Sequence, residues 1–226
     1  MATTKNLTAV GLFAGIGGIE LGLKSAGIET ELLCEIEPGA CAVLEKRFVG
    51  VPIHRDIRTL RSLPKVDLVA GGFPCQDLSQ AGKTAGIRGS NSGLVGEVFR
   101  LLSRKEGPRW LLLENVPFML RLGGGHAMRF LTRTLDDLGF RWAYRTVDTM
   151  AFGLPQRRQR VILLASRTED PTEILFHGDV TPSLVEASHS RTYGFYWTEG
   201  IRGLGSAQDA VPTLKGGSTI GIPSPP

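Results

Sequence analysis

The stretch that decides the fold is LTAVGLFAGIGGIELGLKSAG, residues 7–27. It begins with a short apolar run, residues 7–13, and ends with apolar residues at helical spacing up to Gly27. A glycine-rich turn, residues 13–18, joins the two parts. Glycine lets the backbone approach a ligand closely, and the first N–H groups of a helix are free to bind one. The stretch therefore predicts a strand, a ligand-binding turn and a helix.

The same alternation continues along the chain to about residue 167. Further strands are expected at 30–37, 66–73 and 109–116, and helices at 38–48, 93–105 and 126–139. A closing pair of strands is expected at 141–153 and 157–166. Strands that alternate with helices favour a doubly wound α/β sheet.

The pattern changes towards the C-terminal end. Residues 171–226 are rich in Gly, Pro, Ser and Thr and have no long helical period. We therefore expect one α/β domain over residues 1–170 and a separate, loop-rich region over residues 171–226.

The composition excludes several classes of protein. A membrane-spanning helix needs about 20 successive apolar residues, and no such run occurs. The N-terminus does not resemble a secretory signal. The three cysteines, Cys34, Cys41 and Cys75, form no CxxC pair, so we expect neither a disulfide framework nor a metal site. The reducing cytoplasm is the expected location.

The charge distribution is uneven. The net charge is +4, but the block from Arg121 to Arg167 contains nine arginines, no lysine and only three acidic residues. Such a block forms either a solvated basic face or a surface that contacts phosphates or bases. Charge alone leaves both alternatives open.

Two acidic residues follow predicted strands close to the glycine turn. The dinucleotide pattern G-x-G-x-x-G is not met, because a third glycine after Gly15 and Gly17 would fall at Glu20, so a pyrophosphate is not the favoured ligand. Glu35 lies at the end of the second strand, where an acid binds ribose hydroxyls. Asp56 ends a possible third strand and is suited to an adenine amino group. The alternative for both is a surface carboxylate.

Three further sites carry reactive side chains. Cys75 follows an expected strand, and it is either a small filler or a nucleophile whose thiolate is stabilised. Glu114 ends the apolar run WLLL and serves either as an acid or as a turn cap. Arg158 and Arg160 are two residues apart, so on a strand they face the same side. The alternative for these arginines is a basic surface strand.

Four motifs, GLFAGIGG, GGFPCQDLS, LLLENV and QRRQR, resemble in order and spacing those of the cytosine-5 DNA methyltransferases over roughly residues 7–167. The resemblance implies a Rossmann-like mixed sheet of the S-adenosyl-L-methionine-dependent methyltransferase type. It also implies transfer of a methyl group to carbon 5 of a flipped cytosine in double-stranded DNA, within a restriction-modification system. Residues 171–226 resemble the opening of the family's target-recognition region.

The resemblance assigns catalytic roles to four residues. The thiolate of Cys75 attacks carbon 6 of the cytosine and forms a covalent adduct. Glu114 binds the ring at N3 and the amino group. Arg160 binds the cytosine O2, and Arg158 supports the cysteine loop.

The resemblance also assigns binding residues. Phe13 stacks near the adenine, Glu35 binds the ribose, and Asp56 with Ile57 holds the adenine edge. The full set of expected cofactor-binding residues is Phe13, Gly15, Ile16, Gly17, Gly18, Glu35, Ile36, Asp56, Ile57 and Pro74. The expected DNA-binding residues are Gln76, Ser79, Asn115, Gln156 and Arg157.

Members of the family continue with motifs that have no counterpart in these 226 residues. We therefore expect either a truncated product or one subunit of a split enzyme, whose second polypeptide carries the missing motifs. Two alternatives are an inactive remnant that keeps cofactor or DNA binding, and a tRNA cytosine methyltransferase. The intact Cys75, Glu114 and Arg160 argue against the remnant.

Overall fold

The computed structural model describes residues 6–74, 93–104, 107–179, 193–197, 204–208 and 210–212. The chain divides into two compact units. The first consists of Met1–Arg145 and Val161–His177, and the second of Thr146–Arg160 and Gly178–Pro226. Within the described ranges, no helix is both long and apolar enough to cross a membrane.

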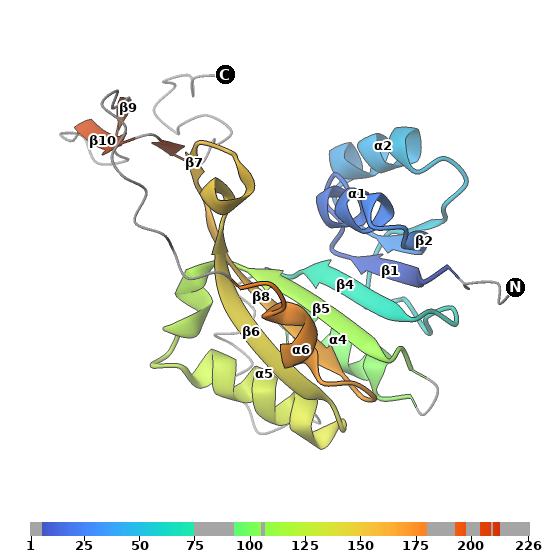
Figure 1. Ribbon diagram of the computed structural model, residues 1–226. Helices are drawn as coiled ribbons and strands as arrows, with labels where there is room; N and C mark the ends of the chain where they lie inside the picture. Colours follow the sequence, from blue (N-terminus) through green and yellow to red (C-terminus); the bar gives the residue numbers. More distant parts are fainter. Residues whose placement is uncertain are drawn as a thin grey trace, which may run out of the picture. The chain divides into compact units, whose positions relative to one another are not determined.

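A seven-stranded sheet forms the centre of the first unit (Figure 1). Its strand order is β3-β2-β1-β4-β5-β8-β6. The strands are β1 (Thr8–Leu12), β2 (Glu29–Cys34), β3 (Ile53–His54), β4 (Leu68–Gly72), β5 (Trp110–Asn115), β6 (Arg141–Asp148) and β8 (Gln159–Ser166). Neighbours from β3 to β5 are parallel, whereas β8 is antiparallel to β5. The expected mixed α/β sheet is confirmed.

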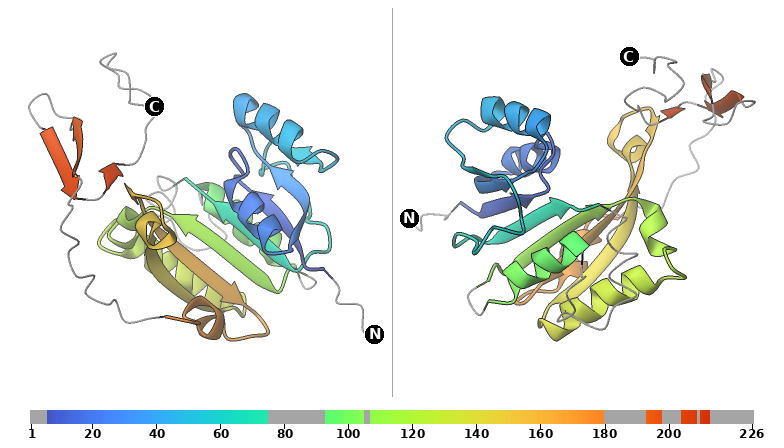
Figure 2. Two further views of the ribbon diagram at one scale, coloured as in Figure 1. Left: turned by 45° about the horizontal axis from the view of Figure 1, so that its top comes forward. Right: turned by 180° about the vertical axis from the view of Figure 1, so that it is seen from behind.

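Helices cover both faces of this sheet (Figure 2). They are α1 (Gly18–Ser25), α2 (Pro38–Arg47), α4 (Gly93–Leu102), α5 (His126–Asp137) and α6 (Pro171–Leu175), with a 3-10 turn η1 (Pro117–Leu120). Val10 and Leu12 of β1 pack in one core cluster with side chains of α4 and α5. Ala9, on the opposite face of β1, packs with residues of α1 and α6. The sheet is therefore doubly wound, as the alternating pattern predicts.

Two expected strands end earlier than their apolar runs suggest, and hydrogen bonds explain both ends. The strand expected to reach residue 37 ends at Cys34, because the Glu35 carboxylate binds N–H groups of its own loop. The strand expected to reach residue 153 ends at Asp148. The Asp148 side chain accepts from the Met150 N–H and begins the 3-10 turn η2 (Thr149–Phe152).

The second unit contains short strands. They are β7 (Gln156–Arg157), β9 (Tyr193–Trp197), β10 (Leu204–Gln208) and β11 (Val211–Pro212). β9 and β10 pair antiparallel, and β11 pairs parallel with β7. The Val211 N–H donates to the Pro155 carbonyl at 2.8 Å. The expected domain division after residue 170 stays a prediction.

Arg167 joins the C-terminal ends of α4 and α5. Its Nη2 donates to the Leu102 carbonyl at 2.6 Å, and its Nε donates to the Leu138 carbonyl at 3.4 Å. The guanidinium lies 4.4 Å from the centre of the Phe140 ring. A cation at these positions also complements the negative ends of both helix dipoles. Arg167 therefore has an internal structural role, which neither interpretation of the basic block foresaw.

We expect Arg167→Lys to lower the free energy of unfolding by about 2 kcal/mol, because a lysine cannot bond both carbonyls and stack on the ring. Arg109→Lys is the matched control, since Arg109 is exposed and its contacts to Asp67 and Glu169 are 3.7 and 3.6 Å. In urea titrations, the free energy of unfolding of the control should fall by less than about 0.5 kcal/mol. Equal losses in both variants would contradict this role for Arg167.

Candidate functional site

Parallel strands bring most of the predicted site residues of the first unit to one edge of the sheet. β3, β2, β1, β4 and β5 are neighbours in that order and run in the same direction. Their carboxyl ends therefore meet at a single edge, which is where open α/β sheets bind ligands. Asp56, Glu35, the glycine turn and Pro74 follow β3, β2, β1 and β4 in that order, and Glu114 is the last residue but one of β5.

The glycine turn between β1 and α1 uses unusual backbone angles. Phe13 has φ of 54° and is the one non-glycine residue with positive φ in the described ranges. Gly15 and Gly17 have φ of 56° and 86°, which glycine adopts without strain. A Cβ on Gly17 would lie 2.4 Å from the Phe48 ring, so packing also requires this glycine.

The other two glycines of the turn border open space. A Cβ added to Gly15 or to Gly18 would meet no atom within 4 Å. Gly18 also has an ordinary negative φ, so neither packing nor backbone angle requires a glycine there. A ligand that approaches the turn closely explains its absent side chain.

The Glu35 carboxylate holds the turn against the end of β2. Its Oε2 accepts from the Gly15 N–H at 2.7 Å, and its Oε1 accepts from the N–H groups of Ile36 and Glu37, each at 2.9 Å. A carboxylate oxygen can accept two hydrogen bonds, so Oε2 keeps room for a ligand hydroxyl. The predicted contact with a ribose is compatible with this geometry.

Asp56 and Ile57 lie beyond the end of β3. Both oxygens of Asp56 accept from Arg58 Nε, at 3.0 and 3.1 Å. This hydrogen bond, with that from the Arg58 N–H, lowers the pKa of the Asp56 carboxyl. The Ile57 side chain is only 3% exposed and belongs to the core. Any contact of Ile57 with a ligand is therefore limited to its backbone.

Two large apolar side chains near the turn are exposed to solvent. Ile16 and Ile36 are 60% and 61% exposed, although most isoleucines are buried. They follow β1 and β2, which are neighbours in the sheet. Such side chains suit the flat faces of an adenine.

The chemistry of this edge suits a nucleoside with a positively charged, phosphate-free substituent. Residues 13–18 contain no lysine or arginine that would pair with a phosphate. The carboxyl groups of Glu20 and Glu35 lie beside the turn instead, and Asp56 follows β3 at the same edge of the sheet. Carboxylates accept hydrogen bonds from hydroxyl and amino groups and favour positive charge. S-Adenosyl-L-methionine, with its sulfonium and two hydroxyls, fits this set.

Glu20 is the residue of this edge that the sequence analysis missed. It is only 1% exposed, and neither of its carboxyl oxygens has a hydrogen-bond partner. Burial raises its pKa to about 7, and the negative Glu35 adds to the rise, while its own backbone N–H acts in the opposite direction. An acid in the first turn of a helix usually pairs with the helix dipole at the surface. The signal for burial was Gly11, whose missing side chain leaves room for this carboxyl.

Glu114 lies over a glycine of the neighbouring strand. It pairs with Gly72 across β5 and β4, and a Cβ on Gly72 would be 2.9 Å from Glu114 Oε2. The next residue, Asn115, is 5% exposed and donates from Nδ2 to the Phe73 carbonyl at 2.9 Å. Asn115 therefore fixes the end of β4, and its contact with DNA stays a prediction.

The predicted nucleophile Cys75 lies outside the described residues, as do Gln76 and Ser79. The two described cysteines, Cys34 and Cys41, are both buried. Burial raises the pKa of the Cys34 thiol to about 12, with contributions from Asp56 and Glu35. The Cys41 thiol donates to the Glu35 carbonyl. Neither of them has the exposed setting of a reactive thiolate.

The arginine motif belongs to the second unit. Arg158 interrupts the strand between β7 and β8, and its N–H donates to the Gln156 carbonyl at 3.0 Å. Arg157 and Gln159 are exposed, whereas Gln156, Arg158 and Arg160 are half-buried. This alternation is compatible with the expectation that Arg158 and Arg160 face the same side.

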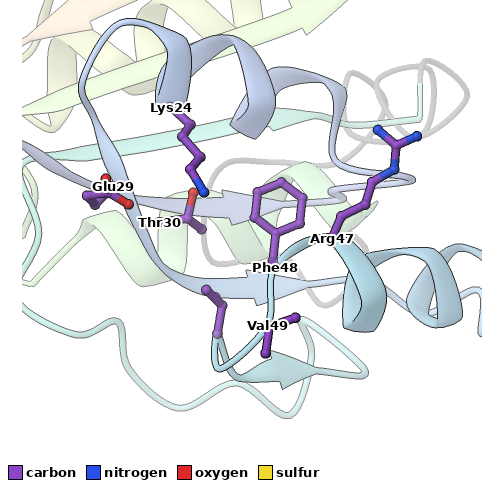
Figure 3. A pocket seen from close by; sticks show the side chains of 7 residues that line it. Lys24, Glu29, Thr30, Arg47, Phe48 and Val49 are labelled. Carbon is purple, nitrogen blue, oxygen red and sulfur yellow. The ribbon is translucent and has the colours of Figure 1, made fainter.

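A pocket of about 240 Å³ lies at the opposite edge of the sheet (Figure 3). It borders the start of β2 and the C-terminal ends of α1 and α2. It is lined by Lys24, Glu29, Thr30, Arg47, Phe48, Val49 and Val51. It contains no predicted site residue, so it is not the cofactor site.

Known proteins resemble this chain over most of its length. The family model for C-5 cytosine-specific DNA methylase matches residues 7–199. Type II methyltransferase M2.BsuMI of Bacillus subtilis (strain 168) is 57% identical over 97% of this chain. Type II methyltransferase M.BsuFI of Bacillus subtilis is 35% identical over 70% of it. The chain spans only 59% and 39% of the length of these two relatives.

Solved structures share the fold. S. pombe Dnmt2 methyltransferase matches with a TM-score of 0.61 and 18% identity, over 80% of this chain and 58% of that one. A putative DNA modification methyltransferase encoded within an E. coli prophage matches with a TM-score of 0.61 and 20% identity, over 87% and 62%. The doubly wound sheet is therefore of the methyltransferase type.

We expect Gly17→Ala to destabilise the protein more than Gly15→Ala. Both substitutions put a side chain at positive φ, which costs roughly 1 kcal/mol. Gly17→Ala adds a clash with the Phe48 ring, worth a further 1–3 kcal/mol or so. Urea titrations of both variants measure the difference. Equal losses would show that Phe48 moves aside without cost.

The raised pKa of Glu20 predicts a pH-dependent stability. The folded protein holds the Glu20 proton more tightly than the unfolded chain, whose value is near 4.5. The associated stability is complete below pH 4.5 or so and is lost as the pH rises through about 7. Relative to Glu20→Gln, the wild-type free energy of unfolding should fall by up to about 3 kcal/mol over this window. Parallel pH profiles of the two proteins would contradict the assignment.

Proposed function

Because the chain belongs to the C-5 cytosine-specific DNA methylase family, we propose that it takes part in methyl transfer from S-adenosyl-L-methionine to carbon 5 of cytosine in double-stranded DNA. The observation that carries the proposal is the order of groups along one edge of the sheet. The cofactor turn and its carboxylates follow β1, β2 and β3, and Glu114 lies at the carboxyl end of β5. The loop that begins at Pro74 follows β4, between them in the sheet.

Cys75 is the proposed nucleophile. Its thiolate bonds to carbon 6 of the cytosine, and the electron pair of the 5,6 double bond moves into the ring towards carbon 5. S-Adenosyl-L-methionine, when bound, supplies an electrophilic methyl group to carbon 5. Loss of the proton from carbon 5 then breaks the bond to Cys75 and restores the aromatic ring. The base must leave the duplex to reach this edge.

Glu114 is proposed to bind the ring at N3 and the amino group, which stabilises the charge that develops on attack. Gly72 supports this role, because its missing side chain leaves room for the Glu114 carboxyl. Asn115 holds the chain at Phe73 through its hydrogen bond to the Phe73 carbonyl. Phe73 is two residues before Cys75, so this bond fixes where the loop begins.

The arginine motif is proposed to contact the substrate. Arg160 would bind the cytosine O2, and Arg158 would support the cysteine loop. Arg157 and Gln156 would contact the DNA, and Arg157 is exposed as such a contact requires. These assignments rest on the family resemblance, and all four residues belong to the second unit.

Two further parts of the proposal concern the setting of the enzyme. One is a second polypeptide that acts together with this chain, as the family resemblance implies. A reducing cytoplasm is the proposed location. It is supported by Cys34 and Cys41, which are buried as free thiols.

We expect Cys75→Ser to lower methyl transfer to duplex DNA by at least roughly a thousandfold, because a serine hydroxyl is a poor nucleophile here. The wild-type chain should also form a covalent complex with DNA containing 5-fluorocytosine, since fluorine blocks the final proton loss. Cys75→Ser should form none, while it still binds the cofactor. Cys41→Ser is the matched control and should keep both activities, because its hydroxyl can replace the buried thiol.

The assay is performed with the chain alone and with a candidate second polypeptide, on duplex DNA and on tRNA. Equal trapping by the wild type and Cys75→Ser would overturn the nucleophile assignment. Methyl transfer to tRNA but not to DNA would overturn the proposed substrate. Full activity of the chain alone would overturn the need for a second polypeptide.

A further inference from the structure

The buried carboxyl of Glu20 lies directly beneath the glycine turn. Glu20 is the third residue of α1, two residues after Gly18. Its Oε1 lies where the side chain of Gly11 would be, only 2.1 Å from the position of an added Cβ. Gly11 is on β1, just before the turn starts at Phe13. The carboxyl therefore fills the space between the end of β1 and the start of α1.

Apart from its own backbone N–H, no group in the described chain stabilises the ionised form of this buried acid. Neither oxygen of Glu20 has a hydrogen-bond partner, although buried polar groups in proteins are nearly always hydrogen-bonded. Unsatisfied buried carboxyls are costly and are concentrated at functional sites. The unpartnered carboxyl of Glu20 therefore indicates a ligand that interacts with it when bound.

Within the ranges that the structure describes, the charged groups around Glu20 give it no cationic partner. β1 and β4 carry no titratable residue between Thr8 and Leu12 or between Leu68 and Gly72. The titratable groups of α1 and of β2 and its end are Lys24, Glu29, Glu31, Cys34 and Glu35. Of these, Glu35 acts on Glu20, and it disfavours the ionised form. A positive ligand at the turn would instead favour the ionised form of Glu20.

We propose that Glu20 makes the cofactor site prefer the positively charged sulfonium of S-adenosyl-L-methionine over the uncharged thioether of the product, S-adenosyl-L-homocysteine. Near neutral pH, roughly half of the Glu20 carboxyls carry a proton when the site is empty or holds the product, and this proton is released to solvent when the sulfonium binds. Glu20 is a positioning residue that acts through its charge, and no covalent bond other than O–H breaks. The inference rests on the proposed function, in which this edge binds S-adenosyl-L-methionine.

The preference follows from the charges of the two ligands. A sulfonium carries a fixed positive charge at every pH, whereas a thioether carries none. In a partly desolvated site a nearby positive charge lowers the pKa of a carboxyl by roughly one unit or more. The difference should be visible near neutral pH, because the pKa of Glu20 without ligand is about 7.

The test is calorimetric titration of the full chain with S-adenosyl-L-methionine and with S-adenosyl-L-homocysteine, in buffers that differ in ionisation enthalpy. Near pH 7, we expect the sulfonium to release up to about half a proton per molecule bound, and the thioether to release less. From pH 5.5 to 7.5 or so, the affinity for the sulfonium should rise roughly tenfold relative to that for the thioether. Sinefungin, in which an amine replaces the sulfonium, should behave like the sulfonium.

Two variants separate this role from a purely structural one. Glu20→Gln should keep binding of the thioether but lose the extra proton release and the pH-dependent preference. Glu31→Gln, which removes an exposed carboxyl from β2, is the matched control and should behave as the wild type. Circular dichroism melting checks that both variants are folded.

The outcomes distinguish the inference from the function on which it rests. Equal proton release with the sulfonium and the thioether in the wild type would overturn the role of Glu20 and leave the proposed function standing. This comparison needs no variant, so it holds even if Glu20→Gln fails to fold. An unchanged preference in a folded Glu20→Gln protein would also overturn it. Failure of the wild type to bind either ligand would overturn the proposed cofactor and the inference together.

Discussion

The three hydrogen bonds of the Glu35 carboxylate determine the shape of the ligand-binding edge. They fasten the Gly15 N–H of the turn after β1 to the loop after β2. Phe13, the non-glycine residue of the turn with a positive φ, keeps this angle only if such contacts hold the turn. Gly17 adds a second constraint, because the Phe48 ring of the α2 end packs where its side chain would be. Turn, helix and sheet are thus fixed together by one carboxylate and one missing side chain.

Missing side chains explain two further features of the same sheet face. Gly11 leaves room for the Glu20 carboxyl, and Gly72 leaves room for the Glu114 carboxyl. Gly11 and Gly72 lie on the same face, since the register pairs Gly11 with Ala70, two residues before Gly72. The carboxyls of Glu20 and Glu114 therefore lie against the backbone of these two glycines. A buried carboxyl without a partner is unstable in its ionised form, and this gives Glu20 its sensitivity to a positive ligand.

Much of the fold was predictable because hydrophobic periodicity depends on local geometry. The strand at Thr8–Leu12 and the helices from Pro38 and His126 follow the expected pattern within a few residues. The strand ends at Cys34 and Asp148 were not predicted, because side-chain hydrogen bonds to nearby N–H groups end these strands within apolar runs. The acids Glu35 and Asp56 were recognised because they follow strands. Glu20 was missed, since the space that buries it belongs to Gly11, a residue on another element.

The sequence by itself determined the order of motifs, the alternation of strands and helices, and the chemical identity of the candidate groups from Phe13 to Arg160. These depend on residue type and on spacing along the chain. Only the tertiary structure decided which acids are buried, and which arginines bind the protein's own carbonyls, as Arg167 does. It also decided that Asn115 fixes the end of β4. The physical reason is that burial and hydrogen bonding depend on neighbours that are distant in sequence, and local spacing does not encode them.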